Sequence, residues 1–196
     1  MPGLGNPDAV RIWSQCDVFM APKGTTLPPA SDLLVDLPNT FKQVGILDED
    51  QGVAWQADGD RQKFFGYGGG LIRTSFAKEA LSGQFTPVEN NAVVWPLANP
   101  GSEVTTGGGV TSRMRRPLNL GLAIVVLVFE FYDGDIKMRR IIPNAQCSMS
   151  DTQTFSDAAL ASTPITADML LYKGVDDKTW FYRDDTNDPA AAVSGS

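Results

Sequence analysis

The side chains that most often do chemistry in proteins are scarce in this chain. The sequence contains no histidine, which removes the commonest general acid or base and the commonest metal ligand. Its two cysteines, Cys16 and Cys147, are too few and too far apart in sequence to form a zinc motif. We interpret both as small buried apolar residues, with a disulfide as the less favoured alternative. A histidine-dependent catalytic triad and a zinc site are therefore excluded.

The remaining candidate motifs favour turns and strand edges over catalytic or binding sites. The acidic run Asp48-Glu49-Asp50 lacks the alternating ligands and terminal glutamate of an EF-hand loop, so a solvated turn is the better interpretation. Glycine triplets at residues 68–70 and 107–109 precede no Gly-Lys-Ser/Thr sequence and predict hinges or turns instead of phosphate loops. Three serines have aspartates nearby but no histidine or lysine partner in a recognisable arrangement: Ser148, Ser150 and Ser156. We therefore expect no enzyme activity, no metal and no cofactor.

Basic residues gather at two places in a chain that is acidic overall. Sixteen lysines and arginines against twenty-three aspartates and glutamates give a net charge of −7. That is the wrong sign for a protein that wraps nucleic acid by releasing its counterions. One basic cluster holds Arg113, Arg115 and Arg116, and the other holds Arg139 and Arg140. Both could contact phosphate, but we favour salt links to acidic groups on adjacent subunits.

The composition predicts one mostly β domain, a sandwich or small barrel. The chain has 196 residues, 42% of them hydrophobic, which is enough for one well-buried core. Its 19 glycines, 13 prolines and many short β-branched runs favour strands and tight reversals. We divide it into an N-terminal extension (1–9), a single domain (10–187) and a disordered tail (188–196). The longest apolar run, residues 122–129, is too short for a membrane helix, and without a secretory signal at residues 1–6 we expect folding in a cytoplasm.

Alternation of apolar and polar residues predicts the first strand, short runs between turn residues predict the others, and one segment predicts a helix. A long hairpin should pair residues 118–132 with 135–142 around Asp133-Gly134, since Asp-Gly is a strong hairpin signal. The other expected strands cover residues 10–20, 41–47, 53–56, 70–76, 146–155, 164–172 and 179–182. Thr86, Pro87 and Glu89 form a capping-box pattern, which predicts a helix with Val88, Ala92 and Trp95 on one face that ends before Pro96.

Two segments lack a predicted place in the core. Residues 21–40 contain four prolines and should form an extended arm with a brief turn at 31–36. The apolar side chains of this arm need a surface to cover, which we expect a neighbouring subunit to provide. Residues 99–111 should form the most mobile internal loop. Both segments should be mobile in a free subunit and ordered in an assembly.

Several short motifs, taken in order, carry a resemblance to a known family. They are the proline-rich segment at 21–28, the Gly45-Ile46-Leu47-Asp48-Glu49-Asp50 turn, the Ile142-Pro143-Asn144-Ala145-Gln146 link and Phe155-Ser156-Asp157 before Pro164-Ile165-Thr166. In this order and spacing the chain resembles the major tail proteins of long-tailed bacteriophages. The resemblance runs from the first strand to the segment around Trp180.

This resemblance implies a structural virion protein. The implied subunit has a β-sandwich or barrel-like tail tube fold with one short packed helix and long loops. It assembles with itself into hexameric rings stacked around a tape-measure protein, and the tube meets tail terminator and distal tail proteins. DNA passes through without specific binding, no membrane is involved, and the tail is assembled in the host cytoplasm. Alternatives are a related virion or secretion-tube component, or a carbohydrate-binding β-sandwich, although the four tryptophans are scattered rather than clustered.

The resemblance and the charge together indicate candidate contact residues. Contacts between subunits are expected at Pro22, Gly24, Thr25, Leu27, Leu33, Leu34, Arg113, Arg115 and Arg116. The inner wall of the tube should be negative, because a basic ring would hold DNA phosphates. Six copies at −7 each give −42 per ring. The acidic residues expected to face the lumen are Glu130, Asp133 and Asp135.

Overall fold

A computed structural model shows the predicted β-rich fold. It describes residues 10–107, 110–118, 121, 123–153, 155, 157 and 160–191. Strands account for 49% of the structure and helices for 7%. The whole predicted N-terminal extension (1–9) and residues 192–196 of the predicted tail (188–196) lie outside the described residues, as do Gly108, Gly109, Leu122 and Ser156.

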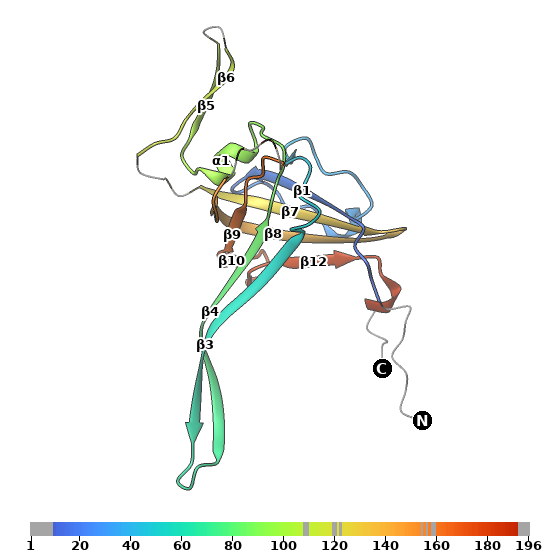
Figure 1. Ribbon diagram of the computed structural model, residues 1–196. Helices are drawn as coiled ribbons and strands as arrows, with labels where there is room; N and C mark the ends of the chain where they lie inside the picture. The colour runs from blue at the N-terminus through green and yellow to red at the C-terminus, as the bar shows by residue number, and fades with distance from the viewer. Residues whose placement is uncertain are drawn as a thin grey trace.

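One branched antiparallel sheet forms the body of the molecule (Figure 1). Its strand order is β2-β1-β7-β8-β9-β4-β3, and β12 also pairs with β8. The strands are β1 (Gln15–Pro22), β2 (Lys42–Gln43), β3 (Val53–Phe65), β4 (Leu71–Phe85), β7 (Ile124–Asp133), β8 (Ile136–Met149), β9 (Ile165–Met169) and β12 (Arg183–Thr186). The sheet branches because the first half of β8 pairs with β12 and the second half pairs with β9.

The predicted long hairpin is confirmed, and its second strand is longer than expected. β7 and β8 pair throughout, joined by a turn in which Gly134 has a φ of +59°, a conformation that suits glycine. Residues 142–146 are not a link between strands, because β8 continues through Pro143. The pairing register shifts between Val125 and Leu127, opposite Pro143. A proline has no N–H to donate, and such an irregularity tolerates it.

Apolar side chains cover both faces of the central strands. On one face, Leu127 and Phe129 join a large core with α1 (Val94–Ala98). On the other face, Val126, Val128 and Ile141 form a smaller core. Because neighbouring residues of a strand point to opposite faces, the continuous apolar run of β7 supplies both cores.

The proline-rich segment covers the smaller core of its own subunit. Leu27, Leu37 and Phe41 pack against that core, and Leu33 is buried. A short 3-10 helix (Ala30–Asp32) forms within the segment, close to the predicted turn. The prediction that this arm lacks a surface in its own subunit is therefore wrong, although two of its apolar residues, Leu34 and Val35, remain exposed.

The predicted helix is in the wrong place. Thr86 and Pro87 are extended, and Leu47 forms an isolated β-bridge with Pro87. The helix begins eight residues after Thr86, at Val94, and Pro96 lies within its first turn, where no helical hydrogen bond is lost. Asn91 caps this helix, since its Oδ1 accepts from the N–H groups of Val93 and Val94 at 2.9 and 3.0 Å. The carboxylate of Glu89 accepts from the Ile46 N–H instead of closing a capping box.

The two ends of the described chain differ from expectation in detail. The first strand begins at Gln15, and Val10 and Ile12 before it are exposed. Asp188, predicted to start a disordered tail, accepts from Arg11 at 2.6 Å and precedes a 3-10 helix (Pro189–Ala191). The predicted hairpin of β10 (Tyr172–Lys173) and β11 (Thr179–Trp180) is confirmed. Sequence patterns did not predict β12.

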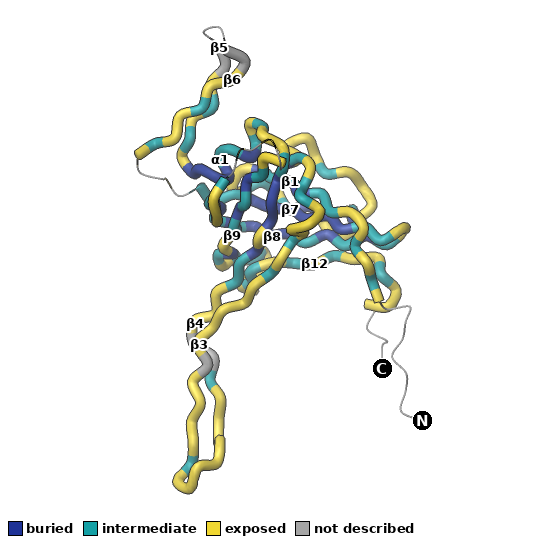
Figure 2. Tube along the Cα trace, in the orientation of Figure 1, coloured by how far each residue is buried: buried dark blue, intermediate teal, exposed yellow. Residues whose placement is uncertain are grey.

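Two hairpins project from the body in different directions (Figures 1 and 2). One is formed by β3 and β4, and the other by β5 (Glu103–Gly107) and β6 (Val110–Arg115). The predicted loop at residues 99–111 is thus mainly a β-hairpin, and its mobility stays a prediction. Among the described residues, no helix is long and apolar enough to cross a membrane.

Candidate functional site

A buried ionic cluster joins β7, β8 and the arm. The Glu130 carboxylate lies 2.6 Å from the Arg139 guanidinium and 2.9 Å from the Lys137 ammonium, and it accepts from the Tyr132 hydroxyl at 2.7 Å. The side chains of Glu130 and Arg139 are only 5% and 1% exposed. Glu130 therefore neutralises charge inside its own subunit, and the expectation that it faces the lumen is wrong.

Arg139 also holds the arm on the sheet. Its two terminal nitrogens donate to the backbone carbonyls of Asp32 and Val35 at 3.0 and 2.9 Å. A second arginine, Arg183 of β12, donates to the carbonyl of Pro28. Arg139 therefore acts within its subunit and does not form the predicted salt link to an adjacent one.

The surroundings of Glu130 shift its pKa. Burial raises the pKa of this carboxyl, but hydrogen bonds from Tyr132, Lys137 and Arg139 outweigh burial, and the net pKa lies below its usual value of 4.5. Burial and the same carboxylate raise the pKa of the Tyr132 hydroxyl. The cluster is thus built around an ionised Glu130.

Acid should weaken the subunit through Glu130. Because its pKa is lower in the folded state, ionised Glu130 contributes stability that is present above pH 4.5 and lost as the pH falls through the folded-state pKa. The free energy of unfolding should therefore fall more steeply with acidification in the wild-type protein than in the Glu130→Gln variant. Urea unfolding between pH 7 and pH 3 measures both slopes, and equal slopes would contradict this role of Glu130.

Arg140 fixes the base of the β3–β4 hairpin to the body. It donates twice to the Asp184 carboxylate, at 2.7 Å each, and its guanidinium lies 4.4 Å from the ring centre of Trp55 and 4.2 Å from that of Tyr182. Trp55, on β3, packs edge-on against Phe129 of the core. A Cβ at Gly83 would lie 2.5 Å from the Trp55 ring, so only glycine fits opposite this side chain. Arg140 therefore also acts within the subunit.

Beyond this base, the β3–β4 hairpin is a free two-stranded ribbon. β9 pairs with β4 at residues 81–85, so within the described part of the chain residues 58–80 pair only with each other. Figure 2 shows the hairpin as mostly exposed. Its outer part exposes large apolar side chains: Phe64, Phe65, Tyr67, Leu71 and Ile72. An isolated two-stranded hairpin is marginally stable in water, and its free edges can pair with other strands.

The structure divides the predicted contact residues among separate surfaces. Pro22 and Gly24 are exposed at the start of the arm, and Thr25 and Leu27 beside them are half-buried. Farther along the arm, Leu33 is buried and Leu34 is exposed. Arg113 and Arg115 are exposed on the β5–β6 hairpin, and Arg116 is exposed directly after it. At the β7–β8 turn, Asp133 is half-buried and Asp135 is exposed, so both remain candidates for the lumen.

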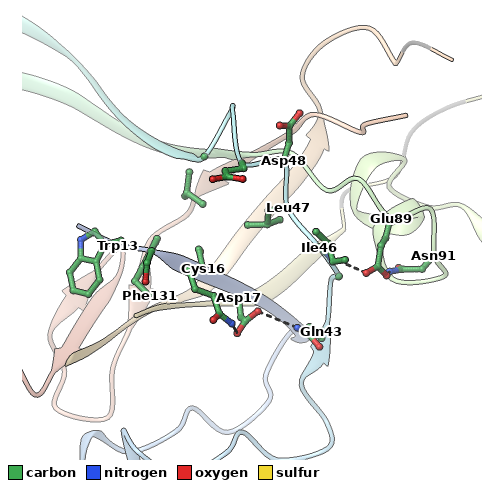
Figure 3. A pocket seen from close by; sticks show the side chains of 16 residues that line it. Trp13, Cys16, Asp17, Gln43, Ile46, Leu47, Asp48, Glu89, Asn91 and Phe131 are labelled. Atoms are coloured by element: carbon green, nitrogen blue, oxygen red, sulfur yellow. Dashed lines mark hydrogen bonds between the residues drawn. The ribbon is translucent and has the colours of Figure 1, made fainter. Parts of the chain in front are cut away.

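A groove that sequence patterns did not predict lies beside the first strand (Figure 3). It has a volume of about 930 Å³ and runs between β1, the turn at residues 45–52 and the segment before α1. Among the described residues, its lining includes four carboxylates and neither lysine nor arginine; the four are Asp17, Asp48, Glu49 and Glu89. In the sequence, the acidic run at residues 48–50 was the only sign of this groove, because its other carboxylates come from distant parts of the chain.

Besides its carboxylates, the groove contains one cysteine thiol, that of Cys16. Burial, with a smaller effect of Asp17, raises the pKa of the Cys16 thiol to about 12, so this lining residue stays protonated at neutral pH. Figure 3 shows Asp17 hydrogen-bonded to Gln43, and Glu89 bonded to the backbone of Ile46. Across the described ranges, no three His, Cys, Asp or Glu residues are grouped so that they could hold a metal ion.

The structure thus combines a branched antiparallel sheet, two projecting hairpins and an acidic groove. The family described as phage tail tube protein matches residues 4–193, and the chain belongs to that family. It is therefore a structural component of the phage tail, and its family implies assembly into a tube with other tail proteins. No curated protein matches the chain.

Proposed function

We propose that this chain is the major subunit of the tail tube, and that its copies form hexameric rings stacked into a conduit for DNA ejection. Membership of the tail tube family supports a tube-forming role. Residues 10–187 act as one subunit domain, which assembles in the host cytoplasm around a tape-measure protein. Tail terminator and distal tail proteins bound the tube at its ends.

The free edges and exposed apolar side chains of the β3–β4 hairpin are the main support for this proposal. Residues 58–80 form a ribbon whose outer edges have no strand partner among the residues that the structure describes, and it exposes Phe64, Phe65 and Ile72. Such edges and apolar groups favour pairing with another chain. In a tube, the neighbouring copies supply strands to the ribbon's edges and cover its apolar side chains.

The inner wall of the tube should carry net negative charge. The net charge of −7 per chain supports this, and Asp133 and Asp135 at the β7–β8 turn are the candidate wall residues. A negative wall repels DNA phosphates, so DNA slides through without specific binding.

Electron microscopy of the concentrated protein tests the proposal directly. We expect negatively stained samples to contain rings or tubes, with or without the tape-measure partner. If the protein stays monomeric at every concentration tested, both with and without the tape-measure partner, the proposed tube is overturned. A tube with a net positive inner wall, or one that binds DNA tightly at physiological salt, would contradict the proposed passage of DNA without binding.

A further inference from the structure

The β5–β6 hairpin is a second free sheet, and one of its faces is basic. In the pairing register, Glu103 lies opposite Arg115, and Thr105 lies opposite Arg113. Alternation along a strand places these four residues on one face, with Arg116 immediately after the strand. All three arginines are exposed, and none forms an ion pair with any residue that the structure describes. The face therefore presents net positive charge, because Glu103 offsets only one of the three arginines.

The groove beside β1 has the opposite charge. Its four carboxylates are not balanced by any basic residue in the lining. Glu49 and Glu89 are exposed, and Asp17 and Asp48 are half-buried. Trp13, Leu47 and Phe131 add apolar surface to the lining. This combination suits a basic peptide ribbon with one apolar face, and on the hairpin Val104 and Met114 lie opposite each other on the face away from the arginines.

The two surfaces are built from different segments of the subunit. Figure 1 shows the β5–β6 hairpin projecting away from the body, whereas the groove is formed on the body by β1, the turn at residues 45–52 and the segment before α1. The groove includes residues 13–17, which contain the start of β1. When two different surfaces of identical copies bind each other, each copy can bind a further copy in the same way. The resulting chain of copies closes into a ring or continues as a helix.

We propose that the β5–β6 hairpin of one copy docks in the acidic groove of the next copy, with Arg113 and Arg115 facing its carboxylates and Arg116 next to them at the end of the strand. This inference rests on the proposed tube and names one of its contacts. Attraction between these opposite charges guides the association of two copies and sets their register. Incorrect pairings are disfavoured because they place like charges next to each other.

Charge reversal on each side tests the contact. The hairpin variant Arg113→Glu/Arg115→Glu and the groove variant Glu49→Lys/Glu89→Lys should each raise the protein concentration needed for assembly by at least about tenfold. The two changes combined in one chain restore opposite charges and should return that concentration to near the wild-type value. Lys173→Glu/Lys178→Glu, a control at exposed lysines on the β10–β11 side, should assemble like the wild type.

Cross-linking tests the contact without relying on charge. In a Cys16→Ser background, Arg115→Cys and Glu89→Cys should be joined between copies by a short bismaleimide in assembled protein and not in dilute monomer. Cys147 is buried with a pKa of about 12, so it should not react. Chains with only one of the two new cysteines are the controls.

The outcomes separate this inference from the proposed function. Tubes of the Arg115→Cys/Glu89→Cys chain that form without the cross-link, or normal assembly of the hairpin variant, would overturn the docking contact and leave the tube intact. Normal assembly of the hairpin variant together with lost DNA binding would assign the arginines to phosphate instead. Failure of the wild-type protein to form rings or tubes would overturn the proposed function itself.

Discussion

Replacing Arg139 with alanine should destabilise the subunit by about 3–5 kcal/mol, the usual cost of removing one partner from a buried ion pair. The change leaves the buried Glu130 carboxylate without its closest cation and the carbonyls of Asp32 and Val35 without their donor. Domains of this size are stable by about 5–15 kcal/mol, so the variant would be close to unfolding. Urea unfolding of dilute protein, followed by tryptophan fluorescence, measures the loss.

Its neighbour Arg140 supplies a matched control. Arg140 also pairs with a carboxylate, but both partners are partly exposed, at 14% and 32%. Arg140→Ala should cost about 1–2 kcal/mol, from an exposed ion pair and its contacts with aromatic rings. Limited proteolysis should cut residues 21–40 faster in Arg139→Ala than in Arg140→Ala. Equal losses of stability in the two variants would contradict the special role of Arg139.

Removing the outer part of the β3–β4 hairpin should abolish assembly and leave a folded subunit. Ala57 and Leu81 are cross-strand partners, so an Asn-Gly turn in place of residues 58–80 can join them without a change of register. The pairing of β4 with β9 remains, because it begins at Leu81. Size-exclusion chromatography and electron microscopy should find a monomer where the wild-type protein forms tubes.

A shorter deletion separates the ribbon from its apex. Phe65 and Leu71 are also partners, and an Asn-Gly turn in place of residues 66–70 keeps both strands. This variant should still assemble, because it retains the strand edges. Tubes formed by the long deletion would show that the ribbon is not a contact between copies. Unfolding of the long deletion would show that the ribbon belongs to the subunit's own fold.

The strongest local patterns in the sequence were reliable. The apolar run of β7, followed by Asp133-Gly134, predicted the central hairpin, and the turn residues at 173–178 predicted the β10–β11 hairpin. The capping-box pattern at Thr86 failed because the Glu89 carboxylate binds the Ile46 N–H, which lies 43 residues earlier in the chain. The side chains of a local motif can also bind groups that the fold brings near. Here the Glu89 carboxylate binds a distant backbone N–H instead of the N-cap residue.

The sequence by itself determined the β-rich class, the main hairpin and the resemblance to tail proteins, because strand alternation and turn residues are local properties. Only the tertiary structure decided where the arm lies, that Arg139 and Glu130 are buried partners, and that carboxylates from three segments share one groove. It also decided which strand edges lie free on β3 and β4. Ion pairs and unpaired strand edges depend on which distant segments come into contact in the fold. Local sequence patterns carry no information about those contacts.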